Sequence, residues 1–183
     1  EMIISIAGCI KMRAIEWYVR QGQLAKDNSY KSLANKFLQK ARQNLVTMSL
    51  LSDLNTNKKP RELLKVPKEY DSNEWVVICG YYSMYTAALS LLAKVGYRSK
   101  NHTATLSVLE ELFVKKKILD SDSLLLLKSA LFHKEEIEKL SDARHKREIA
   151  QYSITRQTTK DIAEKIKKDA YDFINKCEEI INK

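Results

Sequence analysis

Hydrophobic residues recur along most of this chain at the three- and four-residue spacing that places them on one face of an α-helix. The longest regular example runs from Tyr30 to about Leu54. Its apolar stripe consists of Leu33, Phe37, Leu38, Ala41, Leu45, Met48 and either Leu51 or Leu54. The segment from Glu74 to Val95 is the most apolar, which predicts that it lies at the centre of a helical bundle. The same spacing predicts further helices within residues 1–28, 102–117, 121–152 and 158–182.

Residues suited to helix ends separate these segments. Asn101 precedes one predicted helix and can cap it, and either Asp120 or Ser121 can cap the next. Gly96 follows the apolar central helix, where a left-handed residue commonly ends a helix. Thr158 and Asp161 have the spacing of a capping box, so we expect the last helix to begin there.

Residues that break regular structure are scarce, which favours helices over strands. The chain has four glycines and two prolines, too few for the many turns of an all-β fold. Both prolines lie within residues 55–73, which we expect to form a loop. The sequence therefore predicts an all-α fold, an antiparallel up-and-down bundle of four to five long helices plus an N-terminal helix. We expect one domain over residues 1–183, with an N-terminal extension over 1–28 and the bundle over 30–182.

The apolar stretches are interrupted too often for a membrane span of about 20 residues, and the apolar start lacks a basic leader, so neither a membrane protein nor a signal peptide is expected. Cys79 and Cys177 fall on apolar helical stripes, as buried free thiols do. This favours a cytoplasmic protein. Neither metal-ligand spacing nor a phosphate-binding glycine loop is present, so no metal and no cofactor are expected.

The formal net charge of +9, from 32 Lys and Arg against 23 Asp and Glu, favours an anionic partner. The alternative is a lysine-rich surface with no specific ligand. Arg98, Lys100 and His102 form one basic cluster before a predicted helix, a place that suits a phosphate. Alternatively, His102 caps or packs against the start of that helix.

A second basic cluster lies on the predicted helix that runs towards Tyr152. Arg144 and Arg147 are three residues apart and share a face, so that their guanidinium groups can grip a phosphate together. His145 lies between them, and Tyr152 can stack on a base or donate a hydrogen bond. The alternative is a solvated face with pairs such as Arg144 and Glu148.

Four segments resemble HEPN-domain proteins over about residues 30 to 182. Residues 81–102, beginning Tyr-Tyr-Ser-Met and ending Lys-Asn-His, resemble the family's second helix and the link after it. Residues 34–41 resemble its first helix, 147–152 its Arg-x-x-Ala-Asp-Tyr segment and 170–173 its last helix. The resemblance implies a bundle of four or five helices and a homodimer. It also implies a nucleotidyltransferase partner in a toxin–antitoxin pair.

Many members of that family are metal-independent ribonucleases with an Arg, four to six residues, and a His that is often followed by x-Tyr. No arginine of this chain has a histidine at that distance. The nearest case is Arg98 with His102, and Ala150 stands where the motif would place its histidine before Tyr152. Without that imidazole, acid–base cleavage of RNA loses its usual agent.

Three functions are therefore compared. The first is a binding module for nucleotide, RNA or a nucleotidyltransferase, which uses Arg144, Arg147 and Tyr152, with Arg98, Lys100 and His102. The second is a metal-independent endoribonuclease in which His145 or His102 replaces the missing base. The third is a helical subunit that docks an antitoxin and whose basic surface is incidental. The missing motif favours the first.

Overall fold

The computed structural model describes the backbone of residues 12–144 and 152–183, with the side chains of 12–139 and 159–183. The chain forms an all-α bundle, as predicted. Its elements are α2 (Ile15–Arg20), β1 (Leu24–Lys26), the 3-10 helix η1 (Asn28–Leu33), α3 (Ala34–Thr56), α4 (Lys58–Leu63), α5 (Asn73–Lys94), β2 (Tyr97–Ser99), α6 (His102–Leu109), the π-helical turn η2 (Glu110–Val114), α7 (Ser121–Arg144) and α8 (Tyr152–Asn182).

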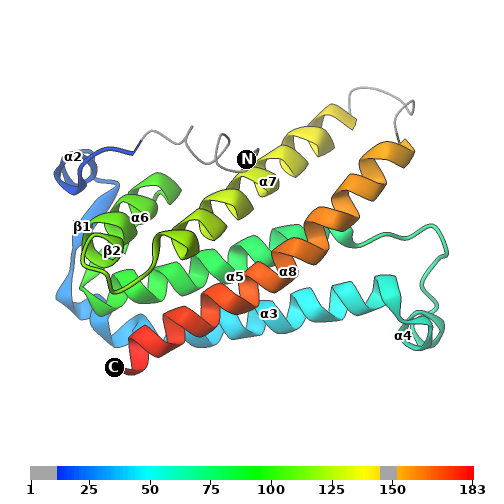
Figure 1. Ribbon diagram of the computed structural model, residues 1–183, viewed down its shortest axis with the longest axis horizontal. Helices are drawn as coiled ribbons and strands as arrows, with labels where there is room; N and C mark the ends of the chain where they lie inside the picture. The colour runs from blue at the N-terminus through cyan, green and yellow to red at the C-terminus, as the bar shows by residue number, and fades with distance from the viewer. Residues whose placement is uncertain (1–11, 145–151) are drawn as a thin grey trace.

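Helix α5 is the centre of the bundle, as its composition predicts. It packs against each of the other long helices, α3, α7 and α8 (Figure 1). Many of its side chains are buried, among them Val76, Val77, Tyr81, Met84, Ala87, Ala88, Leu91 and Leu92. Within the described chain it is the one helix long and apolar enough to cross a membrane, but 67% of that window is buried inside the bundle. Its apolar composition is thus what a core helix requires.

Gly80 allows α5 to approach both of its neighbours closely. A Cβ atom at this position would lie 2.5 Å from Cγ2 of Ile166 on α8 and 3.1 Å from Sδ of Met48 on α3. No carbon atom fits at 2.5 Å, so only a residue without a side chain permits this spacing of the three helices.

A two-stranded antiparallel ribbon, which the sequence analysis did not predict, joins distant parts of the chain. Strand β1 pairs with β2 in the register Leu24 with Ser99, Ala25 with Arg98 and Lys26 with Tyr97. Gly96 has a φ of 74°, the left-handed conformation expected there, and it turns the chain from α5 into β2.

The predicted helix caps are partly confirmed. Asn101 accepts hydrogen bonds from the backbone N–H groups of Thr103 and Ala104, at 2.8 and 3.2 Å. Asp120 accepts one from the N–H of Ser123 at 2.7 Å. The prediction that the last helix begins at the Thr158 capping box is wrong, because α8 already begins at Tyr152.

The segment 55–73 is not entirely loop, because it contains α4. The side chain of Asn57 caps this helix by accepting from the N–H of Lys59 at 3.1 Å. Pro60 is compatible with α4 because it lies in the first turn, where no helical N–H bond is lost.

The close approach at Gly80 predicts the effect of adding one methyl group there. Gly80→Ala should lower the free energy of unfolding by about 1–3 kcal/mol, the usual cost of overpacking. Helix propensity alone would instead raise it by about 1 kcal/mol. Urea denaturation measures this difference, and exposed Gln43→Ala on α3 is the control.

The same substitution should cost less in an Ile166→Ala background, because the clashing methyl group is then gone. A Gly80→Ala protein that is as stable as the parent would contradict this account of the packing.

Candidate functional site

Arg98 and Lys100 are exposed at the outer face of the β1–β2 ribbon. Arg98 pairs with Ala25, and its guanidinium carbon lies 5.7 Å from the ring centroid of Tyr30 on η1. The backbone N–H of Lys100 donates to the carbonyl of Gln23 at 2.9 Å, so this residue continues the ribbon. Because side chains alternate along a strand, positions 98 and 100 belong to the same face.

Two further lysines lie on or beside the ribbon. Lys26 is exposed and pairs with Tyr97, so the same alternation places it on the other face from Arg98. Lys31 lies beside Gly96, because a Cβ atom placed on Gly96 would be 3.3 Å from Cε of Lys31. We call the group of Tyr30, Lys31, Arg98 and Lys100 the basic ribbon. The sequence analysis missed Tyr30 and Lys31, because only the tertiary structure brings them to residues more than 60 positions away.

His102 does not join the basic ribbon. It is the first residue of α6, and its Nδ1 lies 2.6 Å from the hydroxyl of Tyr81 on α5. Its ring also lies against Tyr85, with 4.5 Å between the centroids. The imidazole is thus half-buried and packs α6 against α5.

Burial and the nearby ammonium group of Lys134 hold the pKa of His102 below its ordinary value of 6.5, against the opposite effect of Glu135 and Glu138. Lys134, on α7, is 8% exposed and pairs with Glu138 at 2.6 Å. The imidazole is therefore neutral near pH 7. The pKa of Tyr81 is raised, first by burial and then by the neighbouring Tyr85, so that its phenol keeps its proton.

The burial of the Tyr81 hydroxyl determines the direction of its bond with His102, because a buried hydroxyl needs an acceptor for its proton. The phenol is fully buried, and His102 is the partner of its hydroxyl in the described structure. The hydroxyl therefore donates to Nδ1, which leaves Nε2 of His102 as an N–H group. In this tautomer the accepting nitrogen is already occupied, and a general base needs a free one.

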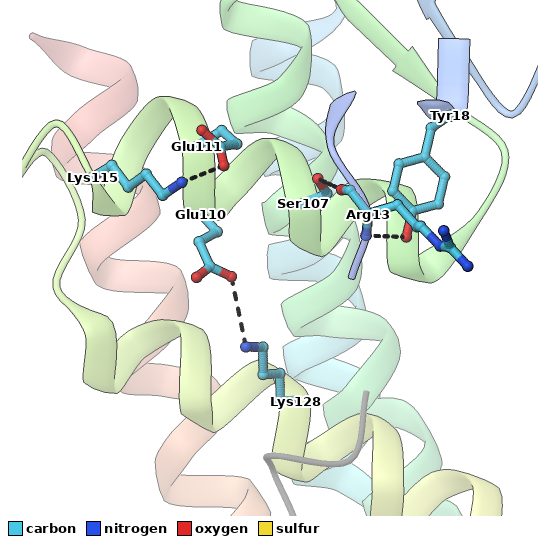
Figure 2. A network of polar contacts seen from close by, with 7 residues as sticks. All are labelled: Arg13, Tyr18, Ser107, Glu110, Glu111, Lys115 and Lys128. Carbon is cyan, nitrogen blue, oxygen red and sulfur yellow. Dashed lines mark hydrogen bonds and ion pairs between the residues drawn. The ribbon is translucent and has the colours of Figure 1, made fainter. Parts of the chain in front are cut away.

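A polar network between α6 and the residues around α2 anchors the segment that leads into β1. The hydroxyl of Ser107 donates to the carbonyl of Arg13 at 2.7 Å, and the N–H of Arg13 donates to the hydroxyl of Tyr18 at 3.3 Å (Figure 2). In the same view Lys128 lies 3.9 Å from Glu110, which joins α7 to η2. The two hydrogen bonds made by the backbone of Arg13 hold α2, and with it the start of the ribbon, against α6.

The second predicted cluster is not placed by the structure. Arg144 ends α7 and Tyr152 begins α8, but their side chains lie outside the described residues, as do His145 and Arg147 altogether. Where the structure does describe the chain, no group of three His, Cys, Asp or Glu residues is arranged to hold a metal ion. Cys177 is buried and Cys79 is half-buried, and both are free.

Comparison with known proteins agrees with the helical arrangement. The family model of the HEPN domain matches residues 62–180. A UPF0332 protein of Archaeoglobus fulgidus is 29% identical over 133 residues, which cover 72% of this chain and 95% of that protein. No solved structure matches the chain at a significant level.

The lowered pKa of His102 predicts a pH dependence of stability. Below about pH 6.5 His102 binds a proton in the unfolded chain more readily than in the folded chain. The free energy of unfolding should therefore keep the whole contribution of His102 above this pH and decrease below it. In His102→Gln this part of the fall should be lost. Urea denaturation between about pH 5 and 8 measures it.

His133→Gln is the matched control, because His133 is a half-buried histidine whose Nδ1 lies 3.3 Å from Glu136. It should retain the fall. Parallel pH curves for the parent and His102→Gln would show that His102 is not held neutral by the fold.

Proposed function

Because the chain belongs to the HEPN domain family, we propose that it is a binding member of that family which holds single-stranded RNA on the basic ribbon. One observation carries the proposal. The structure exposes Arg98 and Lys100 beside Tyr30, whereas His102 has its accepting nitrogen occupied by Tyr81. The cations are free to meet phosphates, and the imidazole is not free to move a proton.

The chemistry of the basic ribbon suits a flexible polyanion. Lysine and arginine side chains that neutralise RNA phosphates release condensed counterions, which supplies most of the affinity. The guanidinium of Arg98 lies over the ring of Tyr30, and an unpaired base can stack on the exposed guanidinium plane. The carboxylate nearest in sequence, Asp27, is engaged by the N–H and hydroxyl of Ser29.

Arg144, Arg147 and Tyr152 remain part of the proposal as a second contact region for the same RNA. The argument for them is the sequence spacing alone: two guanidinium groups on one helical face, followed by an aromatic ring. Their role is separable from that of the ribbon, because each pair of cations can be replaced on its own.

Replacement of two ribbon cations should weaken RNA binding. Arg98→Ala with Lys100→Ala should lower the affinity for a short single-stranded oligoribonucleotide about tenfold or more at low salt. The slope of log affinity against log salt should become shallower by about one per lost phosphate contact. Fluorescence anisotropy over a range of salt concentrations measures both.

Lys58→Ala with Lys59→Ala removes the same charge from exposed positions on α4, at the other end of the bundle (Figure 1), and is the control. If the two double variants lose equal affinity, binding depends on net charge and the ribbon is not the site. No measurable RNA affinity, with capture of a nucleotidyltransferase instead, would replace this proposal by a protein-docking function.

The proposal also predicts that RNA survives incubation with the protein. With a metal chelator present, labelled oligoribonucleotide should remain intact, because the accepting nitrogen of His102 is occupied by Tyr81. Gel electrophoresis measures this. Chelator-resistant cleavage that is lost in His102→Ala or His145→Ala would establish the ribonuclease instead.

A further inference from the structure

The two most exposed large apolar side chains among the described residues are neighbours. Leu63 ends α4 and is 83% exposed, and Leu64 follows it and is 63% exposed. They lie at the end of the bundle opposite the basic ribbon, where α4 is found (Figure 1). A single exposed leucine is ordinary on a protein surface, whereas an adjacent pair with this exposure indicates a contact surface.

Hydrogen bonds hold the turn that carries this pair in one conformation. At the end of α4 the N–H of Lys65 donates to the carbonyl of Glu62 at 3.1 Å, and the N–H of Val66 donates to that of Arg61 at 2.9 Å. Lys65 has a φ of 52°, the left-handed conformation that ends a helix. The guanidinium of Arg61 donates in turn to the carbonyl of Pro67 at 2.6 Å. The leucines are therefore presented to solvent by an ordered turn.

Lysines surround the leucine pair. Between residues 58 and 70 the chain has five basic residues and two acidic ones. Four of the basic residues are exposed lysines, namely Lys58, Lys59, Lys65 and Lys68. We call residues 58–68 the leucine tip. Its positive charge favours an anionic surface as the occupant.

The composition of the leucine tip favours lipid over protein as that surface. Interfaces between proteins are depleted in lysine and enriched in arginine, methionine and aromatic residues. Lysine suits a membrane surface, because its long apolar stem lies along the hydrocarbon boundary while its ammonium group stays among the headgroups. Tyr70, which is 38% exposed just after the tip, belongs to a residue type that is enriched at the same boundary.

Helix α3 offers an internal comparison. Val46 and Leu50 are 60% and 62% exposed, so their exposure is similar to that of Leu64. Residues 43–52 contain no charged residue, however. The coincidence of exposed apolar residues with lysines is therefore particular to the leucine tip.

We propose that the leucine tip docks this protein on an anionic lipid surface. Leu63 and Leu64 enter the outer hydrocarbon region, and the lysines bind the headgroups. Such contact needs no membrane-spanning segment, so it agrees with the interrupted apolar stretches of the sequence. The residues are separate from those of the basic ribbon, so this inference does not depend on RNA binding there.

Co-sedimentation of the full chain with lipid vesicles at low salt tests the proposal. Vesicles of equal parts phosphatidylglycerol and phosphatidylcholine should bind the protein about tenfold or more tightly than vesicles of phosphatidylcholine alone. Leu63→Ser with Leu64→Ser should weaken binding to the anionic vesicles about tenfold or more, because the inserted apolar groups are lost. Lys58→Gln with Lys59→Gln should also weaken it.

Val46→Ser with Leu50→Ser is the matched control, because it removes an exposed apolar pair that has no cations around it. It should bind the anionic vesicles like the parent. All of the substituted positions are exposed, so the variants should fold, and thermal unfolding checks that they do.

The inference is overturned if the anionic vesicles bind none of the parent protein, if neutral vesicles bind it equally well, or if the Leu63 and Leu64 variant binds like the parent. The last result would leave the leucine pair as a contact for a protein partner. The Arg98→Ala, Lys100→Ala protein separates the two proposals. It should lose RNA affinity and keep vesicle binding.

Discussion

The close packing of α5 against α3 and α8 is the constraint on which the rest of this structure depends. Gly80 lets the three helices meet at a distance that any side chain would prevent. Around this point α5 is buried for most of its length, so its two ends are fixed relative to each other. Gly96 follows one end of α5 and leads into the ribbon, and Asn73 begins the other end. A rigid central helix thus positions the basic ribbon.

The polar and charged groups of this protein have different roles at the surface and in the interior. Arg98 and Lys100 keep their charges in solvent, where phosphates can reach them. His102 is half-buried, is neutral and accepts from Tyr81, so it contributes packing between α5 and α6. Arg61 shows a third use, in which a charged group holds the segment after α4 by donating to the backbone carbonyls of Leu54 and Pro67. Together these arrangements favour binding of anions over acid–base chemistry.

The sequence predicts the long helices and the all-α class because the apolar spacing in α3 and α5 is determined by burial, which repeats every helical turn. The caps Asn101 and Asp120 follow from local hydrogen bonding and were also predictable. The ribbon was not, because three-residue strands leave no alternating pattern and their pairing is set by tertiary structure. The role of Arg61 was missed for a related reason. Arg61 acts through carbonyls, which every residue possesses, so its contacts leave no signature in the sequence.

Hydrogen exchange of the full chain with and without a single-stranded oligoribonucleotide tests the central claim most directly, because it locates the bound surface without any substitution. The account predicts that RNA slows exchange in peptides covering residues 23–31 and 97–101, while the amides in the middle of α5 are the slowest in both states. Protection that appears only around residues 102–109, with none in the ribbon, would contradict it.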